Sequence, residues 1–152
     1  MKIRKATIKD LYTIKNLNQE LFHDNKKYDK TLDIMWPRKN LKYYRNCILG
    51  RNSVAFVAEE DNKVVGYIIG SIAEVEDYRI VKKMGEVENL IVLPYYRGRG
   101  IAKKLMREFI IWAKKRKVKR IKVSIYADNE LSVNFHRKMG FVDYDKTMEL
   151  EI

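Results

Sequence analysis

The sequence predicts an α/β (α+β) fold, in which a mixed, mostly antiparallel central sheet of about six or seven strands is flanked by about four helices. Two observations carry this prediction. Residues 53–75 alternate in polarity on both sides of a short polar turn, which is the pattern of an antiparallel hairpin. Residues 85–127 then follow the order strand, helix, strand, which indicates a βαβ unit with one parallel pair. We expect both units to share one sheet, in a single domain that covers residues 1–152.

The first third of the chain predicts one strand and two helices. Residues 2–6 alternate as a short strand, and Thr7 and Asp10 then have the spacing of a capping box, which marks the start of a helix. The apolar face of that helix is formed by Leu11, Ile14, Leu17 and Leu21. Residues 23–39 are polar and broken by a proline, so a loop with one turn at most is expected. Residues 40–49 predict a second, short helix that ends at a glycine.

The second half of the chain predicts alternating strands and helices. Residues 85–93 form a strand that a proline ends, and residues 100–117 form an amphipathic helix. Its apolar stripe is formed by Ile101, Leu105, Phe109 and Trp112. Residues 120–127 alternate as a strand, and residues 130–139 form a short helix with a glycine just past its end. The tail, residues 141–152, is expected to supply one or two final strands.

Composition and charge limit the classes of function. No apolar run approaches the roughly 18 residues of a membrane span, so we expect a cytoplasmic protein that does not enter the membrane. Cys47 is the only cysteine, which excludes an intramolecular disulfide, and one cysteine with two histidines cannot build a Cys/His zinc site, so no metal is expected. The net charge of +12 favours a polyanionic partner, which could be nucleic acid, an acidic membrane surface or a phosphorylated ligand.

The stretch Arg97-Gly98-Arg99-Gly100 lies between the strand and the helix of the βαβ unit. Unpaired N–H groups and the positive end of the helix make an anion site at such a junction, and glycines let the backbone turn sharply there. Two familiar phosphate motifs do not fit. Both the P-loop and the dinucleotide-binding fingerprint require a glycine where the chain has Lys103.

The pattern that fits is Q/R-x-x-G-x-G/A, present as residues 97–102. Together with the opening IRKATIKDL, the hairpin VAFVAEEDNKVVGYIIG and the segment NELSVNFHRKMGF, it makes the sequence resemble the GCN5-related N-acetyltransferases over nearly its whole length. The last segment resembles the family signature N-x-x-(A/S)-x-x-F-Y-x-x-x-G-F, carried here by Asn129, Ser132, Phe135, Gly140 and Phe141. The resemblance implies the fold of the family and acetyl-CoA as the acyl donor.

The resemblance also implies which residues bind that donor. Its diphosphate is expected against the backbone amides and basic side chains of Arg97, Gly98, Arg99, Gly100, Ile101, Ala102 and Lys103. Its pantetheine arm is expected to pair like an extra strand with the strand before the loop, where the tetrahedral oxyanion would take a backbone N–H from Leu90, Ile91 or Val92. The family signature adds Asn129, Ser132, Phe135 and His136 to the binding site.

The chemistry requires a base, because an amine with a pKa near ~10.4 is mostly protonated at neutral pH. Glu86 and Glu88 lie two apart on a strand and therefore project from the same face. Members of the family place a catalytic carboxylate at either position. Glu88 is the first candidate and Glu86 the alternative base or water-holding group, unless both are merely solvated strand carboxylates.

The departing thiolate, with a thiol pKa near ~8.5, is better released with a proton. The usual proton donor of the family is a tyrosine, but this chain has His136 at that position. A histidine can also donate a proton, although its charge changes near neutral pH. Tyr126 is the alternative proton donor. A third interpretation is that His136 only packs near the bound acetyl-CoA.

The sequence therefore predicts an N-acetyltransferase that moves an acetyl group from acetyl-CoA to a primary amine by direct attack in a ternary complex. The acceptor could be a polyamine or other small amine, a peptide N-terminus or a protein lysine, and the acidic residues 74–79 favour a cationic acceptor. One alternative is a catalytically silent acyl-CoA sensor. A nucleic-acid-binding module is the less favoured alternative, because the basic run at residues 114–120 closes a helix, where cations are favoured anyway. The resemblance leaves a homodimer possible.

Overall fold

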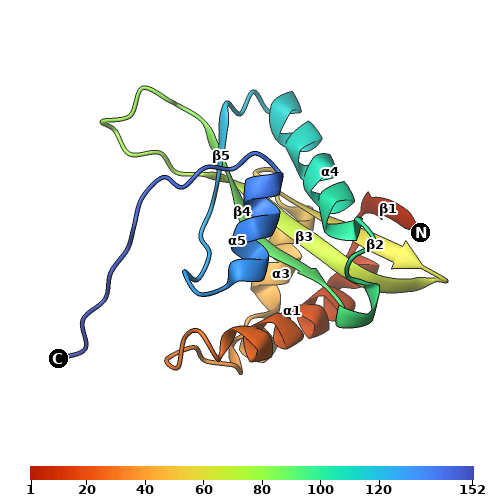
Figure 1. Cartoon of the computed structure of the whole chain (residues 1–152). Helices are drawn as coiled ribbons and strands as arrows, with labels where there is room; N and C mark the ends of the chain where they lie inside the picture. The colour runs from red at the N-terminus through yellow and green to blue at the C-terminus, as the bar shows by residue number, and fades with distance from the viewer.

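The computed structural model describes all of residues 1–152, and its five strands form one sheet in the order β1-β2-β3-β4-β5 (Figure 1). The strands are β1 Lys2–Lys5, β2 Ser53–Glu60, β3 Lys63–Ala73, β4 Met84–Val92 and β5 Arg120–Val123. The α-helices are α1 Leu11–Asn25, α2 Trp36–Lys39, α3 Leu41–Leu49, α4 Ile101–Lys115 and α5 Glu130–Lys138. Two 3-10 turns are η1 Ile8–Asp10 and η2 Pro94–Tyr96.

The sheet is mixed, as the sequence predicts. The first three pairings along it are antiparallel, and only β4 and β5 pair in parallel, across the βαβ unit that contains α4. The hairpin between β2 and β3 turns at Asp61 and Asn62, whose φ angles of 49° and 60° are the left-handed pair that a two-residue hairpin requires. The expected hairpin and βαβ unit are therefore confirmed.

Helices cover both faces of the sheet (Figure 1). One core lies between the sheet and the helices α1 and α3, and its fully buried side chains include Ile14, Tyr44, Tyr67 and Ile69. The other lies between the sheet and α4, with α5 packed beside it, and its fully buried side chains include Ile68, Leu105, Met106 and Phe109. The apolar stripe predicted for residues 100–117 is the face that α4 buries.

The start of α1 is tied to the edge of the sheet by Arg4 of β1. Its guanidinium donates to both carboxylate oxygens of Asp10, at 2.8 and 2.9 Å, and to Glu59 of β2 at 2.8 Å. The Asp10 carboxylate also accepts the N–H of Thr7 at 2.8 Å, as a capping box requires. The helix predicted from this spacing is present, with the 3-10 turn η1 as its first turn.

The strand count of six or seven is wrong, because the tail forms no strand. No backbone hydrogen bond involves residues 142–152, and all of them are exposed. The alternation of polarity that predicted a strand is real. A strand also needs a partner edge, however, and the tail does not pair with one in this structure.

The strand predicted over residues 120–127 ends early, at Val123. Its ladder with β4 runs only from the pair Met84↔Arg120 to the pair Val87↔Val123, and the two strands then diverge. On the side that faced β5, the second half of β4 therefore has no strand partner.

A bulge in β4 lies at the same point. Ile69 of β3 is opposite Asn89, and Gly70 is opposite Val87, so Glu88 is an extra residue in the ladder. Val87 belongs to the core under α4, whereas Asn89 reaches the side chain of Asn18 on α1. Because of this extra residue, the alternation of side chains along β4 shifts by one position, and Asn89 faces the α1 side of the sheet.

We predict that Gly70→Ala lowers the free energy of unfolding by about 1–3 kcal/mol, because its new methyl group would overlap the buried ring of Phe109. Urea unfolding followed by circular dichroism measures this. Ser71→Ala, one position along the same strand, is the matched control and should be nearly neutral, since the Ser71 side chain makes no hydrogen bond. Equal stability of the two variants would contradict the assigned packing of α4 on β3.

Candidate active site

A cleft opens where β4 and β5 diverge. It has a volume of about 740 Å³. Its lining comes from the second half of β4, the loop before α4 together with the first turn of α4 as far as Lys103, residues 123–126 and one side of α5. A second cavity, of about 640 Å³, lies on the α1 side of the sheet, and we call it the aromatic cavity. Its walls include Phe22, Trp36, Tyr43, Asp33, Glu86 and Glu88. The cleft and the aromatic cavity share Val87, Glu88, Asn89 and Ser124, so they meet at the bulge in β4.

One end of the cleft is closed by the start of α4. Gly98 and Gly100 have φ angles of 77° and 76°, a conformation that strongly favours glycine, and a side chain at either position would meet no other atom within 4 Å. The first backbone bond of the helix runs from Lys104 N–H to the Gly100 carbonyl, at 3.1 Å. The N–H groups of Ile101, Ala102 and Lys103 therefore have no partner within the helix, and these residues line the cleft.

The basic side chains of this loop are not equivalent. The guanidinium of Arg97 is turned back on the fold, where its Nε donates to the Val92 carbonyl at 2.8 Å and its Nη2 lies 3.4 Å from Asp24 of α1. Arg99 stacks over two neighbouring tyrosine rings and does not line the cleft. Lys103 is exposed and borders the cleft. Of the three cations expected at the diphosphate, only Lys103 is placed there without another partner.

The long wall of the cleft is the unpaired side of β4. Leu90, Ile91 and Val92 all line it, and β5 no longer covers their backbone groups on that side. An extended ligand arm can therefore pair with β4 as an added strand does.

Glu86 and Glu88 both border the aromatic cavity, as their expected common face requires, but only Glu88 also borders the cleft. Its Oε2 accepts a hydrogen bond of 2.6 Å from the Tyr43 hydroxyl. Glu86 instead lies 3.5 Å from the ammonium of Lys122 on β5. The two carboxylates, which the sequence could not distinguish, thus have different neighbours and different access.

A chain of hydrogen-bonded polar side chains, buried at its inner end and half-buried at its outer end, lies behind Glu88. The side-chain Nδ2 of Asn89 donates to the Tyr43 hydroxyl at 2.9 Å, and Nδ2 of Asn18 on α1 donates to the side-chain Oδ1 of Asn89 at 2.9 Å. Asn18 is 1% exposed, so this chain runs from the core to the cavity surface. This chain fixes the position of the Tyr43 hydroxyl, from which Glu88 accepts a hydrogen bond.

Asn18 is also the centre of a tyrosine cluster. It donates to the Tyr67 hydroxyl at 2.7 Å and accepts from the Tyr44 hydroxyl at 2.5 Å. Asn18 was not among the residues predicted from the sequence, although a signal was present. Asn18 follows Leu11 by seven residues and therefore lies on the apolar stripe of α1, where a polar residue needs a buried partner.

Cys47 on α3 lies beside this cluster and is 6% exposed. Burial raises the pKa of its thiol to about 12, with a further contribution from the nearby charge of Glu88. The thiol therefore stays protonated at neutral pH.

His136 on α5 is buried, and its Nδ1 donates to the Ser132 carbonyl at 2.8 Å. Burial lowers the pKa of the imidazole, which favours the neutral ring. Since Nδ1 then carries the only proton, Nε2 presents a lone pair, and this atom has no hydrogen-bond partner. A neutral His136 in this tautomer has no second N–H to donate.

Tyr126 lies beyond β5 and also lines the cleft. Its hydroxyl donates to Asp29 at 3.3 Å, and burial, with the charge of Asp29, raises its pKa, so the phenol keeps its proton at neutral pH.

Three further residues of the family signature lie together at the start of α5 and along it. Asn129, Ser132 and Phe135 all line the cleft, and the Asn129 side chain caps the helix by accepting the N–H of Ser132 at 3.1 Å. The acidic residues 74–79, expected on the acceptor side, line neither the cleft nor the aromatic cavity.

The chain belongs to the acetyltransferase (GNAT) family, because the model of that family matches residues 12–141. An N-acetyltransferase of Archaeoglobus fulgidus is 31% identical over 119 residues, which cover 76% of each chain. N-alpha-acetyltransferase 30 of Schizosaccharomyces pombe is 28% identical over 92 residues, or 60% of this chain and 59% of that protein. Aminoglycoside N(6')-acetyltransferase type 1 of Acinetobacter haemolyticus is 24% identical over 110 residues, or 72% of this chain and 76% of that protein. The chain spans about half the length, 46% to 59%, of the first curated relatives that it matches.

Solved structures share the fold. A variant of a Bacillus halodurans protein superposes with a TM-score of 0.88 at 24% identity, with full coverage of both chains. A predicted acetyltransferase of Clostridium acetobutylicum, solved with acetyl-CoA, gives a TM-score of 0.80 at 23% identity and covers 99% of this chain and 95% of that one.

Two further observations concern the whole chain. None of its helices has both the length and the apolar composition needed to cross a membrane. No three His, Cys, Asp or Glu side chains are grouped closely enough to hold a metal ion.

The tyrosine cluster predicts a loss of stability in alkali. Burial raises the pKa of Tyr43, Tyr44 and Tyr67 above the value near ~10 of an unfolded chain. The folded state then holds these protons more tightly, so the stabilisation is fully present below about pH 10 and falls as the pH rises further, by about 1.4 kcal/mol per pH unit for each group. Urea unfolding at several pH values between about 8 and 11 measures the slope.

Tyr44→Phe should make that slope shallower, because one titrating group is removed. Tyr12→Phe is the matched control, since Tyr12 is 63% exposed, and it should leave the slope unchanged. The same slope in all three proteins would show that the cluster does not retain its protons.

Proposed function

We propose that the chain is an N-acetyltransferase that transfers the acetyl group of acetyl-CoA to a primary amine by direct attack in a ternary complex, and that residues 1–152 form one domain for this reaction. The observation that carries the proposal is the position of Glu88, where the cleft and the aromatic cavity meet. A thioester in the cleft and an amine in the aromatic cavity come together beside this carboxylate. The reaction needs no metal and no covalent enzyme intermediate.

The groups that line the cleft fit acetyl-CoA. The unpaired N–H groups of residues 101–103, next to Lys103, suit the diphosphate, which a helix N-terminus binds favourably. The unpaired side of β4 suits the amides of the pantetheine arm. Asn129, Ser132, Phe135 and His136 then form the opposite wall. Arg97 contributes indirectly, by holding the end of β4 against α1.

Glu88 is the proposed base. The amine arrives as an ammonium ion, to which a carboxylate binds before it removes the proton. The Tyr43 hydroxyl holds the Glu88 side chain by its 2.6 Å bond, and Asn89 and Asn18 hold that hydroxyl in turn. Glu86 contributes negative charge to the aromatic cavity, and its contact with Lys122 makes it the weaker candidate.

The other two requirements of the reaction are assigned to β4 and to the segment that follows β5. A backbone N–H in the segment Leu90 to Val92 is proposed to donate to the developing oxyanion. Tyr126 is proposed to donate to the departing sulfur, because its phenol keeps its proton, whereas the neutral ring of His136 has its only N–H on the Ser132 carbonyl and its Nε2 is buried.

The aromatic cavity favours a cationic acceptor. Phe22, Trp36 and Tyr43 supply ring surfaces, and Asp33, Glu86 and Glu88 supply negative charge. Rings and carboxylates together attract an amine that carries a second positive group or an apolar body. A small polyamine-like amine fits this chemistry, and the names of the relatives add N-terminal and aminoglycoside amines to the panel for testing.

Binding of acetyl-CoA is tested first. At about 100 times its Kd, the donor should stabilise the folded protein by about 2.7 kcal/mol and raise its Tm. Gly100→Val should weaken binding at least about tenfold by calorimetry, because a β-branched residue disturbs the left-handed turn before α4. Gly140→Val is the matched control, since Gly140 also has a positive φ, of 94°, but does not line the cleft. Equal affinity of both variants for acetyl-CoA would show that the loop before α4 is not part of the binding site.

The base is tested by kinetics. Glu88→Gln should lower kcat at neutral pH by about 10²–10⁴-fold for any accepted amine, with the Kd for acetyl-CoA unchanged. Higher pH should restore part of the rate, because it supplies the free amine without an enzyme base. Glu86→Gln, the matched control, should act mainly on KM for cationic amines. A larger loss of kcat in Glu86→Gln than in Glu88→Gln would show that Glu86 is the base and that Glu88 acts on substrate binding. Tight binding of acetyl-CoA without thiol release from any amine would instead indicate the silent sensor.

A further inference from the structure

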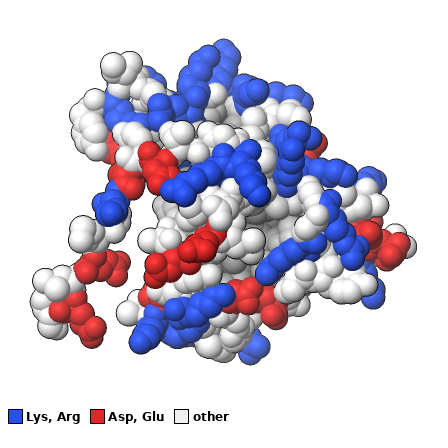
Figure 2. All heavy atoms as spheres, viewed as in Figure 1, with Lys and Arg blue, Asp and Glu red and all other residues white.

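The positive charge of the chain is concentrated in one segment. Residues 97–122 contain twelve Lys and Arg but only one acidic residue, Glu108, and they carry a net charge of +11. The rest of the chain contains 20 Lys and Arg and 19 Asp and Glu, so it is nearly neutral. Figure 2 shows Lys and Arg side chains crowded over α4 and the segment that follows it. The net charge of +12 is therefore a property of α4 and its flanks.

Half of these cations have partners in the fold or border the cleft. They are Arg97, Arg99, Lys103, Arg116, Arg120 and Lys122. The other six are exposed, and their charged groups make no hydrogen bond and have no carboxylate within 4 Å. We call these six residues the basic surface: Lys104, Arg107, Lys114, Lys115, Lys117 and Lys119.

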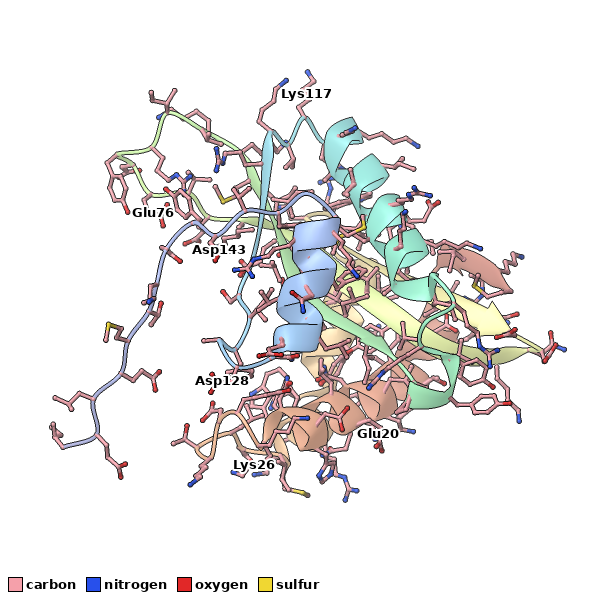
Figure 3. All side chains as sticks on the ribbon, viewed as in Figure 1. Glu20, Lys26, Glu76, Lys117, Asp128 and Asp143 are labelled. Carbon is pink, nitrogen blue, oxygen red and sulfur yellow. The ribbon has the colours of Figure 1, made fainter.

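The basic surface runs along one side of α4. Side chains three and four positions apart share a face of a helix, and positions 104, 107, 111, 114 and 115 follow this spacing. Only Ile111 among them is apolar, because the apolar face of α4 packs on the sheet. Lys117 and Lys119 continue the surface past the end of the helix, and in Figure 3 Lys117 points away from the rest of the protein. The 15 residues of α4 alone give this surface a length of about 22 Å.

The stability of α4 does not explain all of these cations. Lys114 and Lys115 lie in the last turn, where the helix dipole favours a positive charge. Lys104 lies in the first turn, where the dipole disfavours a positive charge, and Arg107 repels Lys103, four positions before it. No acidic residue lies in the first turn to compensate. The charges at this end weaken the helix, which is expected where they serve to attract an anionic partner.

The surroundings of the basic surface favour a nucleic-acid double helix as that partner. A helix that binds a membrane inserts an apolar face, but here only Ile111 is available. A single strand is bound by stacking its bases on exposed rings, but Phe109 is buried and Trp112 is half-buried between Phe109 and Arg116. A double helix needs neither feature. It presents a regular row of phosphates, with one negative charge per about 1.7 Å of its axis.

We propose that the basic surface binds the phosphate backbone of a nucleic-acid double helix without preference for its sequence. Contacts from Lys and Arg to phosphates give affinity but carry no sequence information. None of the six residues lines the cleft. The aromatic cavity lies on the other face of the sheet, because α1 and α4 cover opposite faces (Figure 1). A bound double helix therefore leaves both the cleft and the aromatic cavity open.

The first test is fluorescence anisotropy with a labelled DNA duplex of arbitrary sequence. At about 50 mM salt the Kd should be micromolar, and the logarithm of the association constant should fall with the logarithm of the salt concentration with a slope of about −4 to −5. Duplexes of unrelated sequence should bind equally. An RNA duplex of the same sequence shows which of the two double helices is preferred. No binding to either duplex, or binding that salt does not weaken, overturns the proposal.

The triple variant Lys104→Gln, Arg107→Gln and Lys114→Gln removes three cations of the basic surface. It should weaken duplex binding at least about tenfold and make the slope with salt shallower by about 2.7. Its Tm and its Kd for acetyl-CoA should stay unchanged, because glutamine is a good helix former and none of the three residues lines the cleft. These two readouts show that the variant is folded.

The matched control removes the same charge from other parts of the surface. Lys9, Lys42 and Lys63 are exposed and lie outside α4 and its flanks. Their joint replacement by glutamine should leave the slope with salt unchanged. Equal weakening of duplex binding in the two triple variants would show that only the net charge of the protein matters and would overturn the assigned surface.

A competition experiment separates the basic surface from the cleft. Saturating acetyl-CoA should change the Kd of the duplex by less than about fivefold, the lower limit of typical coupling between two sites. Displacement of the duplex by acetyl-CoA would show that nucleic acid enters the cleft. Binding to vesicles of anionic lipid, with none to either duplex, would assign the surface to a membrane. Either result overturns the proposal.

Discussion

The short parallel ladder between β4 and β5 is the constraint on which the site depends. It holds the two strands together only from Met84↔Arg120 to Val87↔Val123. A longer ladder would close the cleft, whereas a missing ladder would leave β5 and α5 without a fixed position. The bulge at Glu88 begins where the ladder ends, so the same few residues open the cleft and turn a carboxylate toward the aromatic cavity.

The position of Glu88 is held rigid by the core between the sheet and the helices α1 and α3. The chain of groups from Asn18 through Asn89 to Tyr43 links α1, β4 and α3 by hydrogen bonds that water does not reach at its inner end. A hydrogen-bonded chain that is buried at its Asn18 end favours one arrangement, because another arrangement would leave a buried polar group unpaired. The position of Glu88 is therefore set by three elements that are distant in the sequence.

The sequence was sufficient for elements whose signals are local. The hairpin at residues 53–75, the helix after Gly100 and the short helix before Gly140 follow from alternation, periodicity and spacing, and all three are present. The end of β5 at Val123 and the bulge at Glu88 could not be predicted, because both depend on the register between strands that the chain brings together from far apart. The same holds for Arg97, whose charge suggested a ligand contact. Its partners are the Val92 carbonyl and Asp24, and only the fold places Asp24 beside it.

The buried position of Cys47 has a practical consequence. Its thiol is shielded by α3 and the tyrosine cluster, and with a pKa of about 12 it has almost no thiolate at neutral pH. Reagents that react with thiolates, such as aromatic disulfides and maleimides, will therefore find no fast-reacting group on the native protein. A colorimetric reading of free coenzyme A can accordingly be taken continuously, in the presence of micromolar protein, without a blank for the protein itself.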